Sequence, residues 1–316
     1  MTGHQEILAD PSYAGQIVTM TYPQIGNTGV NDEDVESHDQ RVQVRAFVVR
    51  ELSPAVSSFR ADRPLEEYLR AGGVLGLAGV DTRALTRHIR QAGAMNAVLS
   101  TEIDDDAELV RRAAALPSMA GADYVKEVVP AAAYDWPDGY DSPFAQGHRA
   151  HGERVFDVVA VDCGAKMNIL RNLVECGCRV RVVPATASAE EVLAAEPDGV
   201  FISNGPGDPA AVTYTIEMLR GLLGQVPIFG ICLGHQLLTL ALGGRTYKLK
   251  FGHHGCNHPV RNEATGKVEI TSQNHGFVAD ADSLRAAGAT VTHVNLNDQT
   301  VEGFTDPGRA VFSVQY

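Results

Sequence analysis

Strand-like and helix-like segments alternate regularly between residues 155 and 243. The apolar runs "VFDVVAVDCG", "CRVRVVPA", "DGVFISNGPGDP" and "VPIFGIC" are typical of buried strands, and segments with helical spacing of apolar residues lie between them. This alternation predicts βαβ units that build a parallel sheet. Since ligands bind beyond the carboxyl ends of such strands, the loops that contain Cys163, Gly205 and Cys232 should meet at one edge.

The remainder of the chain divides around "DWPDGYDSPFAQGHRAHGE", a segment that mixes Pro, Gly, Asp and His without periodicity. We therefore expect an α/β protein with a smaller N-terminal α/β domain at residues 1–134, a linker at 135–153 and a domain at 154–316. The last of these should contain a mostly parallel sheet flanked by helices. In the first domain, residues 41–52 alternate like a strand, and residues 81–93 predict a helix that Gly93 ends.

Composition excludes several classes of protein. The 316 residues carry a net charge of -13, which disfavours nucleic acid and anionic membranes as partners. No apolar run approaches the roughly 20 residues of a membrane-spanning helix, and the first residues do not resemble a secretory signal. The five cysteines are sparse and odd in number, which indicates reduced thiols and a cytoplasmic location.

One cysteine stands at a turn that predicts chemistry. Gly230, Cys232 and Gly234 have the glycine–nucleophile–glycine spacing of a nucleophile elbow, in which a strained strand-to-helix turn exposes the reactive side chain. The N-terminus of the following helix favours the ionised thiolate, and the Leu233 N–H points to where an oxyanion would form. The alternative, a buried cysteine that acts as a small apolar residue, is the better interpretation of the other four cysteines.

The loop "SNGPGDP" follows the preceding strand and offers a second set of backbone donors. Gly205 and Gly207 flank a proline, so their N–H groups could bind a substrate or an oxyanion. The alternative is an ordinary turn between a strand and a helix, because Asn-Gly and Pro-Gly are common turn dipeptides.

Together, "SNGPGDP" and "PIFGICLGHQ" resemble the paired motifs of the triad-type class I glutamine amidotransferases. "MTGHQEILADPSYAGQIVTMTYPQIGN", "DTRALTRHIR", "VVAVDCGAKMNILRNL", "KFGHHGCNHPV" and "TSQNHGF" are similar to the small, glutamine-hydrolysing subunit of carbamoyl-phosphate synthetase, and the likeness runs along the whole chain. The resemblance implies that a thiolate converts L-glutamine to glutamate and ammonia through a thioester. The ammonia then passes to a large synthetase subunit, which makes carbamoyl phosphate, a precursor of arginine and pyrimidines, from bicarbonate and ATP.

Residue by residue, the resemblance implies that Cys232 is the nucleophile and that Gly205 and Leu233 supply oxyanion N–H groups. The residues that would hold the glutamine are Ser12, Gly205, Gly207, Leu233, Gln236, Asn274, Gly276 and Phe277. Because Ser12 lies in the other domain, such a site would span both domains. The resemblance implies no cofactor in this chain, since ATP and metal are expected on the large subunit.

The resemblance also places the catalytic base in a His-Pro-Glu segment directly after the strand that matches "AVFSVQY". The chain ends at Tyr316, so we expect a fragment that lacks both ends of the natural protein and hydrolyses glutamine poorly. Neither His235 nor His275 is expected to replace the base, because the first should be a packing histidine and the second a loop histidine.

The dense cluster "GHHGCNHP" invites a metal interpretation through His253, His254, Cys256 and His258. Zinc sites more often show two well-separated ligand pairs, so we expect no metal there. Two other functions stay open on the sequence alone. One is a thiol hydrolase of the α/β-hydrolase type, and the other is a non-catalytic scaffold that binds glutamine.

Overall fold

The structure, a computed structural model, describes residues 3–140 and 155–316. The chain forms two compact units, Met1–Ala122 and Asp123–Tyr316. The boundary thus lies before Asp123 and not at residue 134 as the sequence predicted. The correction arises because Tyr134–Trp136 forms a short edge strand, β6, that pairs with the sheet of the second unit. Most of the predicted linker at 135–153 lies outside the described residues.

The helices and strands follow one another along the chain as follows. The α-helices are α1 His4–Ala9, α2 Leu65–Ala71, α3 Thr82–Ala92, α4 Asp106–Ala115, α5 Val125–Val128, α6 Met167–Glu175, α7 Ala189–Leu193, α8 Thr213–Leu222, α9 Leu233–Ala241 and α10 Ala281–Ala286. The strands are β1 Ile17–Thr19, β2 Gln24–Ile25, β3 Ala46–Val48, β4 Glu51–Leu52, β5 Leu75–Leu77, β6 Tyr134–Trp136, β7 Phe156–Asp162, β8 Cys178–Pro184, β9 Gly199–Ile202, β10 Ile228–Ile231, β11 Thr246–Asn262, β12 Val268–Ala279, β13 Thr290–Asn295, β14 Val301–Asp306 and β15 Val311–Val314. The short 3-10 helices are η1 Pro11–Tyr13, η2 Pro209–Ala211 and η3 Pro307–Arg309.

The first unit contains two small parallel sheets, one in the order β1-β3-β5 and one that joins β2 to β4. The predicted strand at residues 41–52 is shorter than expected, because the central strand β3 covers only Ala46–Val48 and is buried throughout instead of alternating. The predicted helix at residues 81–93 is confirmed as α3: Asp81 accepts a hydrogen bond from the Ala84 N–H, and the helix ends at Gly93.

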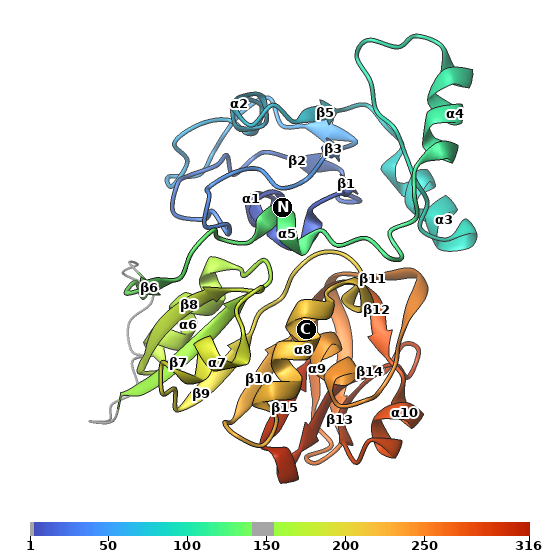
Figure 1. Cartoon of the computed structure of the whole chain (residues 1–316). Helices are drawn as coiled ribbons and strands as arrows, with labels where there is room; N and C mark the ends of the chain where they lie inside the picture. Colours follow the sequence, from blue (N-terminus) through green and yellow to red (C-terminus); the bar gives the residue numbers. More distant parts are fainter. Residues whose placement is uncertain (1–2, 141–154) are drawn as a thin grey trace. The chain divides into compact units, whose positions relative to one another are not determined.

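The second unit is built on a ten-stranded sheet in the order β12-β11-β13-β14-β15-β10-β9-β7-β8-β6 (Figure 1). Five neighbouring strands, β15, β10, β9, β7 and β8, run parallel to one another. The predicted βαβ units are therefore confirmed. Antiparallel strands extend the sheet at both ends, with β11 to β14 on one side and β6 on the other.

Both faces of the parallel strands are apolar, which is why they read as continuous hydrophobic runs. In β7, Val159 and Val161 pack into a core shared with α7, α8 and α9, whereas Ala160 packs on the opposite face with residues of α6. This alternation follows from the period of two along a strand. The helices thus cover both faces, so the carboxyl ends of the strands stay available for a site.

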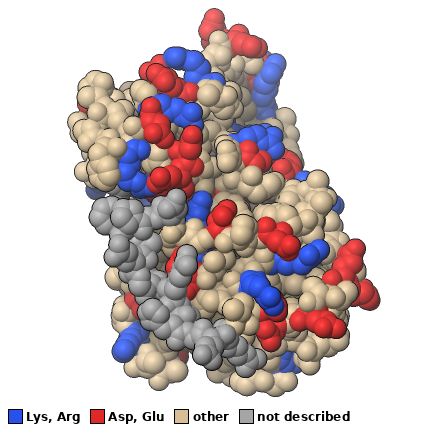
Figure 2. All heavy atoms as spheres, turned by 90° about the vertical axis from the view of Figure 1, so that its left-hand side faces the viewer, with Lys and Arg blue, Asp and Glu red and all other residues tan. Residues whose placement is uncertain are grey.

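Exposed charges of both signs are interspersed on the face of the molecule that Figure 2 displays. Ion pairs form at the surface of the second unit, such as that of Arg179 with Asp157 at 2.6 Å. Within the described part of the chain, no helix is long and apolar enough to cross a bilayer.

Candidate active site

Cys232 occupies the sharp turn between β10 and α9, as the elbow motif predicted. Its backbone has φ 54° and ψ -103°, a strained conformation for a residue with a side chain. Hydrogen bonds hold the turn on both sides: the Cys232 N–H donates to Val314 O at 2.9 Å, and Cys232 O accepts from the Gln236 N–H at 3.1 Å. The side chain is partly exposed, so the interpretation as a sealed core cysteine does not apply to Cys232.

The two glycines of the motif are required by close backbone approach. A Cβ at Gly234 would lie 2.3 Å from Ile202 O, and one at Gly230 would lie 2.8 Å from the carbonyl carbon of Gly234. Moreover, the Gly234 N–H donates to Ser203 O at 3.1 Å, which ties the first turn of α9 to the end of β9. The sequence spacing therefore reflects a strand and a helix that pass too close for any side chain.

The loop after β9 is held by its polar side chains. Ser203 Oγ accepts from the Cys163 N–H at 2.9 Å, and Asn204 bonds to Gly164 O at 2.9 Å and to the Lys166 N–H at 3.1 Å. The loops that follow β7 and β9 are thus bonded to each other, and Gly234 joins the cysteine turn to the same cluster. This confirms the prediction that the three loops meet at one edge of the sheet.

Gly205 lies at the contact between this loop and the elbow. A Cβ built there would be 2.8 Å from Leu233 Cδ2 and only 2.1 Å from Cys163 O. Gly207 has φ 91°, a left-handed conformation that favours glycine. The loop therefore presents backbone beside Leu233, whose own N–H lies in the first helical turn, where amide groups lack an intrahelical acceptor. These are the groups from which an oxyanion site can be built.

Strand β12 borders the thiol on the other side. Cys232 Sγ lies 3.8 Å from Asn274 O, and the Gln236 amide donates to Phe277 O at 2.8 Å and to Gln315 Oε1 at 3.1 Å. Gln236 thereby fixes α9 to β12 through its NH2 group, a role that its position one helical turn after the cysteine did not predict. Gly276, between Asn274 and Phe277, has open space where a side chain would be.

The structure thus gathers most of the predicted site residues within one unit. The elbow and the loop beside it contain or contact Gly205, Leu233 and Asn274. Helix α9 is joined to Phe277 through the side chain of Gln236. Ser12 belongs to the first unit, where it lies in η1 and its N–H donates to Asp10 Oδ1 at 2.8 Å. A role for any of these residues in holding glutamine stays a prediction.

Two histidines lie close to the elbow or to Asn274 along the chain, and both side chains are buried. His235 is fully buried on α9, with its Nδ1 2.8 Å from Ser313 Oγ, and burial lowers its pKa to about 3. His275 bonds to Phe277 O at 2.9 Å and to Gln273 Oε1 at 2.8 Å, and burial lowers its pKa well below the usual value. His235 is therefore a packing histidine, as expected, whereas His275 is a strand residue and not a loop residue.

Burial of neutral His235 predicts a pH-dependent stability. Below about pH 6.5 the His235 imidazole is protonated in the unfolded chain but stays neutral in the folded chain. The folded state therefore loses stability as the pH falls from 6.5 toward 3. Between pH 6.5 and 5 we expect His235 to contribute a loss of about 1.5 kcal/mol, since one pH unit corresponds to about 1.4 kcal/mol.

The measurement is urea unfolding of the wild type and of His235→Asn at pH 6.5, 5.8 and 5.0. Asparagine retains a polar atom near the position of Nδ1 for the contact with Ser313 but does not titrate. The free energy of unfolding should fall less steeply in the variant. Equal slopes in the two proteins would show that His235 is protonated in the folded state.

The four residues His253, His254, Cys256 and His258 do not come together as one group of possible metal ligands in the described structure. Of these four residues, only His253 belongs to a group in the described structure that could hold a metal ion. That group joins His253 to His275 and Glu302, with ligand atoms within 4.8 Å of one another. Cys256 is exposed and contacts Ser272 Oγ at 3.6 Å.

The group of His253, His275 and Glu302 is already hydrogen-bonded without a metal. His253 Nε2 lies 2.8 Å from Asp298 Oδ2, its Nδ1 lies 3.4 Å from Glu302 Oε1, and Asn295 donates to the same Glu302 oxygen at 2.8 Å. Burial alone would lower the pKa of His253, but the hydrogen bonds that its ring donates to Glu302 and Asp298 raise it above the usual value. No local pattern in the sequence indicates Glu302 or Asp298, because they lie on segments far from the histidines along the chain. The absence of a metal stays a prediction.

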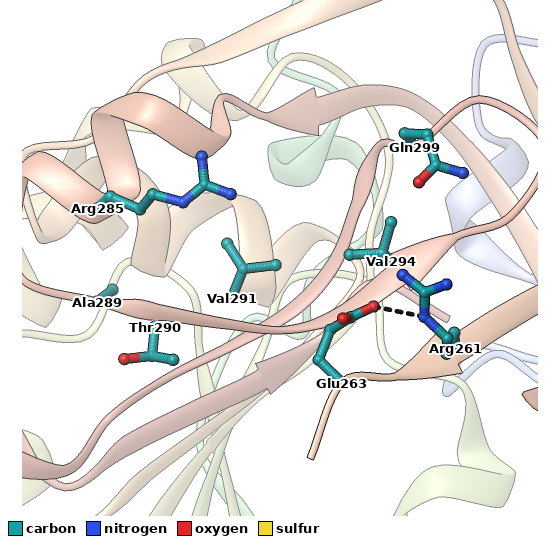
Figure 3. A pocket seen from close by; sticks show the side chains of 8 residues that line it. All are labelled: Arg261, Glu263, Arg285, Ala289, Thr290, Val291, Val294 and Gln299. Atoms are coloured by element: carbon teal, nitrogen blue, oxygen red, sulfur yellow. Dashed lines mark hydrogen bonds and ion pairs between the residues drawn. The ribbon is translucent and has the colours of Figure 1, made fainter. Parts of the chain in front are cut away.

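A surface pocket of about 510 Å³ opens elsewhere on the second unit (Figure 3). Its lining residues come from β11, β13, α10 and the loops next to these elements, and include Arg261, Glu263 and Arg285. Arg261 is paired with Glu263 at 2.8 Å, and Arg285 with Asp282 at 2.9 Å. The pocket contains none of the predicted site residues, so we place the active site at the cysteine turn, where the reactive group lies.

Two parts of the chain match known protein families. Residues 159–316 match the model of the class-I glutamine amidotransferases, and residues 1–99 match the carbamoyl-phosphate synthase small chain, CPSase domain. The first match covers the elbow, the loop after β9 and the sheet apart from β6 and the start of β7, and the second lies within the first unit.

Curated relatives share about half of their residues with the chain. The carbamoyl phosphate synthase small chain of Syntrophotalea carbinolica is 54% identical over 100% of this chain and 83% of its own length. Those of Nitratidesulfovibrio vulgaris (strain Miyazaki F) and Nostoc sp. are 51% and 52% identical, again over 100% of this chain and over 84% and 81% of their own lengths. The family resemblance expected from the sequence is thereby confirmed.

Proposed function

We propose, since the chain belongs to the family of carbamoyl phosphate synthase small chains, that it hydrolyses L-glutamine through a covalent thioester on Cys232. One observation carries this proposal above all. A partly exposed cysteine stands in a strained turn between the Gly205 loop and β12, at the carboxyl edge of a parallel sheet.

The chemistry follows from the groups around the sulfur. The Cys232 thiolate attacks the side-chain amide carbon of glutamine, and the carbonyl oxygen becomes an oxyanion that the N–H groups of Gly205 and Leu233 can stabilise. The carbon–nitrogen bond then breaks, the nitrogen takes up a proton and leaves as ammonia, and a thioester remains. Water attacks the thioester, which releases glutamate and restores the thiol. His235 and His275 have no part in these proton transfers, since both are committed to buried hydrogen bonds.

The remaining polar groups suit an amino acid ligand. Asn274 and Gln236 are neutral amides, and Gly207 and Gly276 expose backbone, which matches the amino group, carboxylate and amide of glutamine. We infer that Ser12 and Phe277 complete this site. Nothing in the comparisons favours a thiol hydrolase of the α/β-hydrolase type or a non-catalytic scaffold.

We also infer a partner and a location. The ammonia would pass to a large synthetase subunit, which would bind ATP and metal and form carbamoyl phosphate, so this chain would need no cofactor of its own. The five cysteines are all free thiols, which supports a reducing, cytoplasmic location.

Acid quenching during turnover tests the proposed intermediate. Radiolabelled glutamine, mixed with the intact two-subunit enzyme and quenched in acid, should leave glutamate bound to the peptide that contains Cys232 as an alkali-labile thioester. A Cys232→Ser enzyme, which retains the shape of the turn, should show no such species. Glutamine hydrolysis at the wild-type rate without a protein-bound intermediate would contradict the proposal.

A further inference from the structure

Strands β11 and β12 meet in register around the thiol. His253 pairs with His275, His254 with Asn274 and Gly255 with Gln273, while the register shifts on both sides of this short stretch. Irregularities of this kind commonly redirect side chains next to active sites. Here they place the His254 side chain directly across from Asn274.

Only the oxygen of the Asn274 side-chain amide has a hydrogen-bond partner among the described residues. Its Oδ1 lies 2.9 Å from His254 Nδ1, whereas its Nδ2 is buried and has no hydrogen-bond partner among the described residues. The backbone oxygen of the same residue lies 3.8 Å from Cys232 Sγ. A buried amide donor without an acceptor is destabilising unless a ligand supplies one. The unpaired NH2 group therefore marks a place for an acceptor beside the thiol.

Gly252 leaves room for the His254 ring. A Cβ at that position would lie 2.8 Å from His254 Nε2 and 2.6 Å from His275 O, and its φ of +77° also favours glycine. The imidazole of His254, an exposed residue, thus lies beside the Gly252 backbone and contacts the amide of Asn274. An amide oxygen can only accept, so this contact is a hydrogen bond when His254 Nδ1 carries the proton. The ring also forms a hydrogen bond with the backbone of Phe251.

We propose that His254 is a positioning residue, which donates a hydrogen bond from Nδ1 to Asn274 Oδ1 and so turns the Asn274 NH2 group toward an oxygen of bound glutamine. The inference rests on the proposed function, because it specifies how that site presents one of its donors. Without His254, the amide of Asn274 can rotate by half a turn and present its oxygen instead. Two oxygens would then face each other, and glutamine would bind more weakly while the thiol chemistry would be unchanged.

Steady-state glutamine hydrolysis by the intact two-subunit enzyme tests this role. His254→Leu, which removes the donor but fills the space, should raise the KM for glutamine about tenfold and change kcat by less than about threefold. His254→Asn places an amide near the position of Nδ1, so it should restore most of the affinity. A KM that does not change in His254→Leu, or an equal defect in both variants, would overturn the proposal.

The double variant isolates the contact. In an Asn274→Ala background, which already lacks the amide, His254→Leu should raise KM no further, because the two residues act through one hydrogen bond. If the two effects multiply independently, His254 acts by another route and the proposal is wrong.

Failure of the inference can be separated from failure of the proposed function by measuring binding without catalysis. Glutamine should raise the melting temperature of a Cys232→Ala enzyme if the site binds glutamine at all. A shift in Cys232→Ala that His254→Leu does not diminish would refute only the role of His254. Absence of any shift, together with absence of glutamine hydrolysis in the wild type, would refute the proposed function itself.

Discussion

Replacing Cys232 by alanine should reduce glutamine hydrolysis by at least about 10³-fold, because the residue that forms the covalent intermediate is lost. Carbamoyl phosphate synthesis from added ammonia by the two-subunit enzyme should continue, since that chemistry would belong to the partner. The measurement compares the two activities of the same preparation with glutamine or ammonium chloride as nitrogen source.

Cys256→Ala is the matched control. Cys256 is an exposed free cysteine on β11 of the same unit, and it should retain both activities. If Cys232→Ala hydrolysed glutamine as fast as this control, another nucleophile would have to be sought. If it lost the ammonia-dependent activity as well, the defect would lie in assembly and not in the thiol chemistry.

Gly234→Ala should reduce both the stability of the fold and glutamine hydrolysis, for a purely steric reason. The added methyl group would lie 2.3 Å from Ile202 O and 2.9 Å from Ile202 C, both backbone atoms that cannot rotate away. Strand β9 and helix α9 must therefore separate, which we expect to lower the free energy of unfolding by about 3 kcal/mol. A shift of the elbow by about 1 Å should also reduce glutamine hydrolysis about 10²-fold.

Urea unfolding and glutamine hydrolysis measure these two effects. Gly199→Ala provides the control in the same sheet, because its Cβ would make only an ordinary contact of 3.7 Å with Pro227 O. The free energy of unfolding of the Gly199→Ala control should differ from that of the wild type by less than about 1 kcal/mol. A Gly234→Ala protein that matches Gly199→Ala in stability and activity would show that the elbow does not need its glycine.

The parallel part of the fold was predictable because its signals are local. The apolar runs of β7, β8, β9 and β10 are bounded by turn residues, and α7, between β8 and β9, carries its own start signal. Ser188 and Glu191, three residues apart in the sequence, form the capping box that begins α7. The elbow was predictable for the same reason, since its glycines and its cysteine lie within five consecutive residues.

What depends on distant partners was not predictable. Strand β6 has only three residues and takes its structure from pairing with β8, so Tyr134 was assigned to the first domain and residues 135–136 to the linker. The cluster around His253 draws Glu302 from another strand, which no local pattern in the sequence indicates. Likewise, the identity of the residues that border the thiol on β12 came from family resemblance, because Asn274 is 42 residues from Cys232 along the chain.

The most direct test of the central claim is labelling of the intact enzyme with a chloroketone analogue of glutamine, followed by peptide mass spectrometry. We expect the analogue to modify Cys232 and excess glutamine to protect it. Cys163, which is fully buried and whose pKa burial raises, should stay unmodified. Labelling confined to the exposed thiols Cys176 and Cys256, unaffected by glutamine, would contradict the assignment of Cys232 as the nucleophile.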